Sequence, residues 1–174
     1  MRTNYLFIII SALIYVVTSS CSNQIKVKGP DELGFLVFEM LEEFDDISSD
    51  DFLKKIISYE DLIQMASNPD VIEYEETRKE ILNLTEAEWK EDVIDDYNSI
   101  KSKAVFHEIK WTNIKYSNFD YEIKNWDGVK KIEGKLIFKK KVNYFLEITY
   151  SVKVESVYDG KHYKILYIHS LMKE

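Results

Sequence analysis

The side chains best suited to chemistry lie in the last third of the chain, where a histidine falls among tyrosines. Residues 142–154 alternate apolar and polar side chains, which predicts a half-buried β-strand, and Asp159-Gly160 is typical of a two-residue hairpin turn. Such a turn sets Tyr150 opposite His169. A histidine beside a carboxylate can act as a general base at neutral pH. The sequence identifies no acidic partner for His169, so a hydrogen-bonded structural histidine is the simpler interpretation and no catalytic residue is assigned.

The chain also contains 12 tyrosines, and several fall in the predicted strands. Tyrosine hydroxyls gathered on one face of a sheet could line a ligand pocket. Strand positions favour tyrosine for packing alone, which is the competing interpretation. The candidates for lining such a pocket are Tyr121, Tyr150, Tyr163, Tyr167 and His169.

The sequence lacks the familiar motifs of phosphate binding, nucleophilic catalysis and metal binding. It contains no Gly-rich phosphate loop, no nucleophile elbow, no cysteine pair and no two histidines at the spacing of a helical metal site. Paired acidic residues recur, but none follows the alternating Asp-x-Asp-x-Asp-Gly pattern of a calcium loop. We therefore expect no metal site and no cofactor.

Charge is divided unevenly along the chain. Residues 31–100 contain 22 acidic and 5 basic residues, and residues 101–174 contain 9 acidic and 15 basic ones, within a net charge of −8. An acidic protein lacks the dominant basic face that a phosphate backbone requires, which argues against nucleic-acid binding. The acidic half predicts a solvated helical face or a docking surface for a basic protein. Lys139-Lys140-Lys141 is typical of a solvated strand end and also suits anionic lipid headgroups.

Residues 1–20 are mostly apolar and carry one charge, Arg2, which is the layout of a signal peptide. The segment ends in Thr18-Ser19-Ser20-Cys21, where small residues precede the only cysteine of the chain. These residues resemble the lipobox of bacterial lipoproteins, although Thr18 stands where Leu is usual. The resemblance implies cleavage before Cys21, lipid on its thiol and a tether over residues 21–30. An ordinary secretory signal and an uncleaved helical anchor are the alternatives.

The residues after Cys21 indicate in which compartment and membrane we expect the protein. Ser22 is followed by Asn23 and not by an acidic residue, and resemblance to the sorting rules of enteric bacteria then favours the outer membrane. The mature chain has no other cysteine and needs no disulfide in an oxidising envelope. We therefore expect a protein of the bacterial cell envelope, attached to its membrane through lipid on Cys21.

Residues 31–101 are predicted to be helical, because apolar residues recur there at spacings of three and four. Capping residues that precede amphipathic segments indicate helix starts at Ser49, Ser58 and Thr85. Thr85 and Glu88 have the spacing of a capping box. This half of the chain should therefore form several short helices and a longer last one.

After residue 103 the apolar period changes to two, which predicts an antiparallel meander over residues 104–172. We expect strands at Val105–Tyr116 and, with a bulge or bend, from Val142 to Tyr158. Helices followed by an antiparallel meander sheet of four to five strands predict an α+β fold, with residues 31–174 as one domain.

The charges near the two Asp-Gly pairs favour one turn length over another. At Asp127-Gly128 a two-residue turn sets Lys124 against Lys131, and like charges directly opposite are unfavourable. A four-residue loop that starts at Asp127 is therefore preferred. In the second hairpin, the two-residue turn sets Glu155 opposite Lys164, which favours that turn.

Three segments carry a resemblance to a known fold: Phe52–Leu62, Trp111-Thr112-Asn113-Ile114 and Tyr158–Ile165. In this order they are similar to envelope lipoproteins of the Bacteroidota type with a nuclear transport factor 2-like, cystatin-like roll. The resemblance implies that the sheet is curved and forms a cone-like roll with the helices. The pocket of such a cone serves catalysis, ligand binding or dimerisation in relatives, and fold alone chooses none of these.

We therefore expect a lipid-anchored envelope domain that binds without catalysis. Its expected partners are the membrane, through Cys21, and either a protein at the acidic helical face or a small ligand in the sheet concavity. One alternative is a pocket enzyme of the isomerase, dehydratase or hydrolase kind that uses His169 or a buried tyrosine. Another is an immunity-type lipoprotein that blocks a basic toxin. The oligomeric state stays open, with a dimer among the outcomes.

Overall fold

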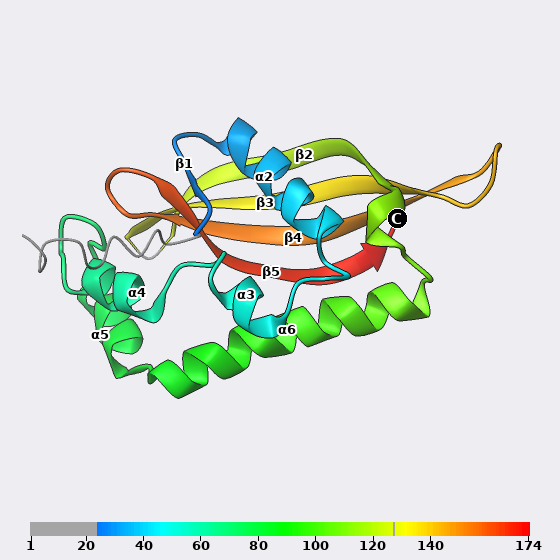
Figure 1. Ribbon diagram of the computed structural model, residues 1–174. Helices are drawn as coiled ribbons and strands as arrows, with labels where there is room; N and C mark the ends of the chain where they lie inside the picture. Colours follow the sequence, from blue (N-terminus) through cyan, green and yellow to red (C-terminus); the bar gives the residue numbers. More distant parts are fainter. Residues whose placement is uncertain (1–23, 127) are drawn as a thin grey trace, which may run out of the picture.

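The structure, a computed structural model, describes residues 24–126 and 128–174 (Figure 1). Within these residues helices come first and an antiparallel sheet follows, so the predicted α+β class is confirmed. The elements in chain order are β1 (Lys26–Val27), α2 (Pro30–Glu42), α3 (Ser49–Leu53), α4 (Tyr59–Ala66), α5 (Glu75–Asn83), α6 (Glu86–Phe106), a 3₁₀ turn η1 (Trp111–Asn113), β2 (Ile114–Trp126), β3 (Val129–Lys141), β4 (Glu147–Tyr158) and β5 (Tyr163–Lys173).

The strands form one sheet in the order β1-β5-β4-β3-β2, and all neighbours are antiparallel. Strands β2 to β5 make the predicted meander, and the short β1 adds to the far edge of β5. The sheet curls into a half-barrel, with α2 packed on β2 and β3 and with α6 lying along β5 (Figure 1). The arrangement is the predicted cone-like roll.

The core lies between the helices and the inner face of the sheet. Alternation within β3 and β4 turns one set of side chains inward, and α6 buries residues spaced three and four apart against them. The inward positions of these three elements are Ile132, Leu136, Phe138, Tyr150, Val152, Val154, Trp89, Val93, Tyr97, Ile100 and Ala104.

Two glycines make room for Phe119, a buried residue of β2. A Cβ atom added to Gly34 of α2 would lie 2.4 Å from the Phe119 Cβ, and one added to Gly134 of β3 would lie 2.2 Å from the Phe119 Cζ. These distances are far inside van der Waals contact. The ring therefore fills the space that both glycines leave open, and it fixes α2 against β2 and β3.

Helix capping follows the sequence closely. Thr85 and Glu88 form the predicted capping box at the start of α6, and the Ser58 side chain accepts a hydrogen bond from the backbone of Asp61 at the start of α4. The cap of α3 is Ser48, whose hydroxyl accepts from the Asp51 backbone N–H at 3.1 Å. The cap therefore lies one residue before the expected Ser49.

The strand expected at Val105–Tyr116 is wrong. Helix α6 continues to Phe106 because Ala104 is buried one turn after Ile100 and extends the same apolar face. Glu108, with a φ of 53°, then turns the chain, and β2 begins at Ile114 after η1. The helical half therefore extends past residue 101.

The first hairpin has the two-residue turn that charge argued against. Trp126 pairs with Val129, and Lys124 lies opposite Lys131. Both lysines bind the same carboxylate: their Nζ atoms lie 2.6 Å and 2.7 Å from oxygens of Glu133. The prediction of a four-residue loop was wrong because it counted only the directly opposed pair and not the acidic side chain beside it.

The long strand expected from Val142 to Tyr158 is divided into a loop and β4. The Asn143 side chain accepts hydrogen bonds from the backbone N–H groups of Phe145 and Leu146 at 2.9 Å and 3.0 Å. The Val142 N–H donates to the carbonyl of Leu146 at 2.9 Å. These contacts close a tight hairpin over residues 142–146, which the regular alternation of the sequence conceals.

The second hairpin has a longer turn than expected. Tyr158 pairs with Tyr163, which leaves four residues in the loop where the sequence predicted two. The Asp159 carboxylate accepts hydrogen bonds from the backbone N–H groups of Lys161 and His162, each at 2.8 Å. Hydrogen bonds from the backbone to the Asp159 side chain therefore stabilise a four-residue loop in place of the two-residue turn.

Candidate functional site

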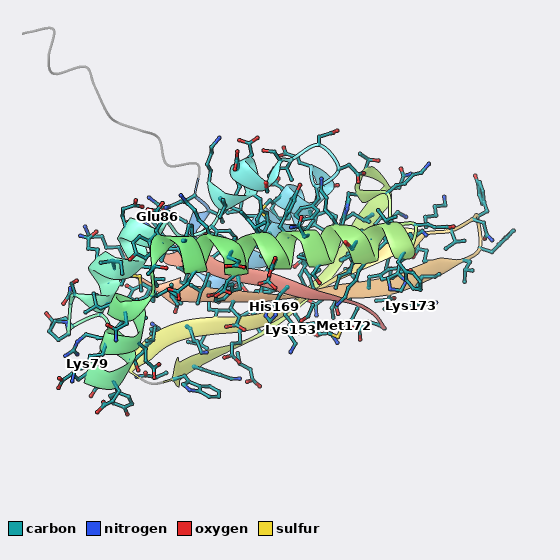
Figure 2. The ribbon with its side chains drawn as sticks, turned by 90° about the horizontal axis from the view of Figure 1, so that it is seen from below. Lys79, Glu86, Lys153, His169, Met172 and Lys173 are labelled. Atoms are coloured by element: carbon teal, nitrogen blue, oxygen red, sulfur yellow. The ribbon has the colours of Figure 1, made fainter. Side chains whose placement is uncertain are left out.

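The longer loop separates the residues that the predicted register paired. Tyr150 lies opposite Lys173, and His169 lies opposite Lys153 (Figure 2 labels His169, Lys153 and Lys173). Two register shifts within the β4–β5 pair add to the effect of the loop. The predicted neighbours Tyr150 and His169 therefore do not meet.

The observed register instead brings His169 to a carboxylate. Glu155 faces Tyr167 across the strand pair and not Lys164 as expected, and its Oε1 lies 3.2 Å from His169 Nε2. The Ser170 hydroxyl lies 3.2 Å from the other ring nitrogen, Nδ1. Ser170 also has a φ of 59°, in the left-handed region that non-glycine residues seldom adopt. The Ser170 hydroxyl, the His169 imidazole and the Glu155 carboxylate therefore lie next to one another in a row. Such an arrangement can move a proton.

Helix α6 adds acidic groups beside this cluster. The hydrogen bond with His169 holds the pKa of Glu155 below its usual value. Burial raises the pKa of Tyr167, and the negative charge of Asp92 raises it further. Burial also raises the pKa of Asp96. Glu155 is therefore ionised and Tyr167 protonated at neutral pH.

The cluster is partly open to solvent. The side chains of His169 and Glu155 are 25% and 29% exposed. Beside Glu155, on the outer face of the sheet, lies a hollow of about 410 Å³ whose lining is strongly charged. Its charged lining includes Asp120, Lys124, Glu133, Lys135, Lys153 and Glu155. Small-molecule pockets are mostly apolar and enclosed, so this surface hollow is of a different kind.

The remaining candidate tyrosines are spread over the sheet. Tyr150 and Tyr163 are buried in the core, where Tyr150 stacks on Phe138 with ring centres 6.0 Å apart. The Tyr121 hydroxyl donates to Asp31 at 3.2 Å, at the edge of α2. Within the described part of the chain, the predicted pocket residues therefore do not line one cavity.

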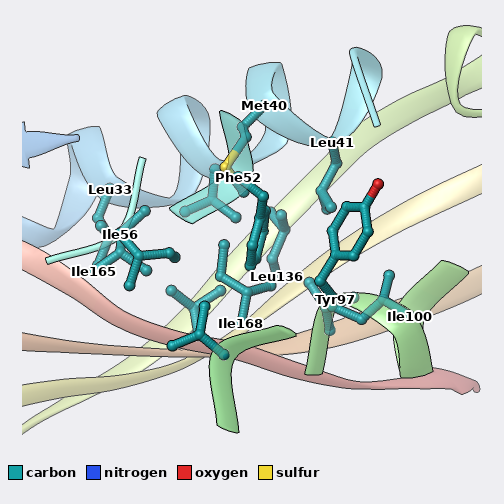
Figure 3. Close-up of a cluster of buried hydrophobic side chains, with 14 of the residues drawn as sticks. Leu33, Met40, Leu41, Phe52, Ile56, Tyr97, Ile100, Leu136, Ile165 and Ile168 are labelled. Carbon is teal, nitrogen blue, oxygen red and sulfur yellow. The ribbon is translucent and has the colours of Figure 1, made fainter. Parts of the chain in front are cut away.

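The space between helices and sheet, where the resemblance implied a pocket, is filled by apolar side chains (Figure 3). Residues from α2, α3, α4, α6 and the five strands of the sheet belong to this one cluster. Its labelled members are Leu33, Met40, Leu41, Phe52, Ile56, Tyr97, Ile100, Leu136, Ile165 and Ile168.

Metal-binding clusters and membrane-spanning helices are both absent from the described residues. No group of three or more His, Cys, Asp or Glu side chains among them could hold a metal ion. No helix among them is long and apolar enough to cross a membrane. Cys21 and the predicted signal peptide lie outside the described residues.

Glu155 and Ser170 did not stand out in the sequence. Alternation places Glu155 on the same strand face as Lys153, but which β5 residue it meets depends on a loop length and two register shifts.

No family model, no curated protein and no solved structure matches this sequence. The function has to be inferred from the residues themselves.

Proposed function

We propose that this protein is a lipid-anchored component of the bacterial cell envelope that acts by binding a protein partner at its surface and not by catalysis. The observation that carries the proposal is the filled core: apolar side chains of the helices and of the sheet pack into one cluster on the concave side of the sheet (Figure 3). The hollow on the outer face is open and charged, which suits surface contacts better than small-molecule chemistry.

The acidic helical layer is the surface we propose for the partner. Exposed acidic side chains occur along α6 and around α3, and few lysines neutralise them. The exposed ones include Glu42 at the end of α2, Glu43 and Asp46 in the connection to α3, Asp50 of α3, and Glu91, Asp92 and Asp95 of α6. A basic protein fits such a face by charge, and a basic toxin of the kind that an immunity-type lipoprotein neutralises is one such protein.

The anchor is tested with the full-length chain. Growth with labelled palmitate should label the wild-type protein and leave Cys21→Ala unlabelled, and the variant should leave the membrane fraction. A Cys21→Ala chain that keeps the label would contradict lipid attachment at this residue. Retention of an unlabelled chain at the membrane would point to an uncleaved helical anchor.

Partner binding is tested with residues 22–174, which contain every buried core residue that the structure describes. We expect crosslinking to an envelope protein that is lost in Asp92→Asn/Asp95→Asn and weakened at high salt, because exposed charges are screened there. The matched control is Glu122→Gln, an exposed acidic residue of β2. Equal loss in the control variant would show that net charge, and not the helical face, determines binding.

A pocket enzyme is the second candidate, favoured by the contact between His169 and Glu155 at 3.2 Å. A general base of this kind predicts hydrolysis of small esters by the wild type and loss of that turnover in His169→Gln. A wild-type protein with no turnover across an ester panel would dismiss this candidate.

A further inference from the structure

The hairpin between β3 and β4 ends in side chains that nothing in the described structure covers. We call residues 142–146 the β3–β4 tip; it projects from one end of the sheet (Figure 1). Phe145 is 99% exposed and Tyr144 is 89% exposed, the highest values among the large hydrophobic residues described. Val142 and Leu146, on either side, are 45% and 48% exposed. Exposed apolar groups gathered in this way mark an interaction site.

The backbone of the tip is held firmly although its side chains are free. Asn143 accepts two backbone hydrogen bonds, from Phe145 and Leu146, and the Val142 N–H closes the loop on the Leu146 carbonyl. The rings of Tyr144 and Phe145 lie with their centres 6.3 Å apart. The tip therefore presents a preformed pair of aromatic rings to whatever it meets.

Lysines surround the base of the tip. Lys139, Lys140 and Lys141 end β3, and Lys115 lies on the neighbouring strand. Lys141 Nζ lies 4.9 Å from the centre of the Tyr144 ring. Glu147 is the only acidic residue between positions 139 and 147, and its carboxylate lies 3.3 Å from Lys115 Nζ. The same carboxylate also lies 3.7 Å from Lys139 Nζ, and Lys140 Nζ donates to the His107 carbonyl at 2.7 Å. Four lysines and one glutamate therefore leave a positive excess at the base of the tip.

A hollow between η1 and the tip brings several donors together. Its volume is about 520 Å³, and its polar lining is Thr112, Asn113, Lys115, Lys141 and Asn143. Two ammonium groups, two amides and a hydroxyl are groups that bind phosphate oxygens. Val142 and Tyr144 of the tip also line this hollow, so it adjoins one of the two exposed rings.

We propose that the β3–β4 tip is a docking element for a lipid bilayer with anionic headgroups. Phe145 and Leu146 enter the acyl boundary, Tyr144 lies at headgroup level, and Lys115 and Lys141 contact lipid phosphates. A narrow projecting hairpin offers little of the roughly 800 Å² that a stable protein interface buries on each partner. A bilayer needs no shape complementarity, and the combination of aromatic rings with lysines suits its interface.

This contact is separate from the proposed lipid anchor. The first described strand, β1, pairs with Tyr163 and Lys164 at the start of β5, which is the opposite end of β4 from the tip (Figure 1). The 12 residues of β4 lie between these ends, a length of about 40 Å. The inference therefore rests on residues 112–147 alone and not on Cys21.

The test uses residues 22–174, which lack cysteine and contain all of the core found among the described residues. Cosedimentation is measured with vesicles of phosphatidylglycerol and phosphatidylcholine in equal parts, and with phosphatidylcholine alone. We expect binding to the anionic vesicles to fall at least tenfold in Tyr144→Ser/Phe145→Ser, and about fivefold for each lysine removed in Lys115→Gln and Lys141→Gln. Trp126→Ser, 55% exposed at the other end of β2, is the matched control and should bind as the wild type does.

A second measurement reports insertion directly. A Phe145→Cys variant that carries a polarity-sensitive dye should brighten with anionic vesicles, and Lys161→Cys, on the loop at the opposite end of β4, should not. Wild-type protein that stays in the supernatant with anionic vesicles overturns the proposal. So does unchanged binding of Tyr144→Ser/Phe145→Ser, equal binding to neutral vesicles, or a dye at position 145 that reports only water. A failure of palmitate labelling at Cys21 would leave these results unaffected.

Discussion

Replacing Glu133 with glutamine removes the carboxylate that allows two lysines to face each other in the first hairpin. Hydrogen bonds from Lys124 and Lys131 lower the pKa of Glu133 from 4.5 to about 2. Without any reduction by solvent, this lowering of the pKa corresponds to about 3.4 kcal/mol of stability at neutral pH. The Glu133 side chain is 28% exposed, and Lys124 also contacts Glu122 at 3.1 Å, so solvent and the second carboxylate reduce the effect. We expect Glu133→Gln to lower the free energy of unfolding by about 1.5 kcal/mol at pH 7.

The sign of the pH dependence follows from the lowered pKa. A carboxyl whose pKa is lower in the folded state stabilises the fold fully above its unfolded pKa, and this contribution is lost as the pH falls through the folded value. For Glu133 the window runs from 4.5 down to about 2. The difference in unfolding free energy between wild type and Glu133→Gln should therefore stay constant from pH 7 to about pH 5 and shrink towards pH 2. Urea unfolding of residues 22–174, followed by circular dichroism, measures it.

Two variants make this test specific. Glu122→Gln removes a carboxylate that is 74% exposed and contacts Lys124 only, so it should cost less than about 0.5 kcal/mol. Adding Lys131→Gln to Glu133→Gln removes the uncompensated repulsion and should restore part of the loss. Equal effects of Glu122→Gln and Glu133→Gln at pH 7, or a Glu133→Gln effect that does not change between pH 5 and pH 2.5, would refute the reasoning.

Three further substitutions test the packing and capping by the same urea measurement. Gly134→Ala should cost about 2 kcal/mol, because the new Cβ would lie 2.2 Å from the Phe119 ring; a neutral effect would mean that the ring can move aside. Tyr97→Phe should cost about 1 to 2 kcal/mol, because its buried hydroxyl donates to the Ile47 carbonyl at 2.7 Å, and an unchanged stability would contradict that bond. Thr85→Ala should cost about 1 kcal/mol through loss of the cap, whereas a larger loss would indicate a role beyond the helix end.

The helical half shows which features are local enough to predict. The capping box of Thr85 and Glu88, the cap at Ser58 and the apolar face of α6 each depend on residues within one or two helical turns of one another. The end of α6 was missed because Val105 and Phe106, although 78% and 81% exposed, read as the start of an apolar strand. Apolar residues alone do not distinguish an exposed helix end from a buried strand.

The register of the sheet, in contrast, could not be predicted from the sequence. Alternation along β3 and β4 correctly predicted an antiparallel sheet, but both turns adjoining the critical residues had other lengths than expected. Glu133 stabilises one turn from six residues away, and Asp159 holds the other through its own side chain. A change of two residues in a loop moves every cross-strand neighbour, which is why the sequence could not pair His169 with Glu155.

The sequence by itself determined the order of helices and strands, the α+β class, most helix starts and the inward side of β3 and β4, because periodicity and capping are short-range properties of the chain. The tertiary structure decided the register of the hairpins, the glycine space around Phe119, the filling of the concavity and the contact between His169 and Glu155. It also decided that residues 142–146 are an exposed tip and not the start of a strand. These features depend on contacts between residues far apart in the chain, whose distances are set only when the sheet closes on the helices.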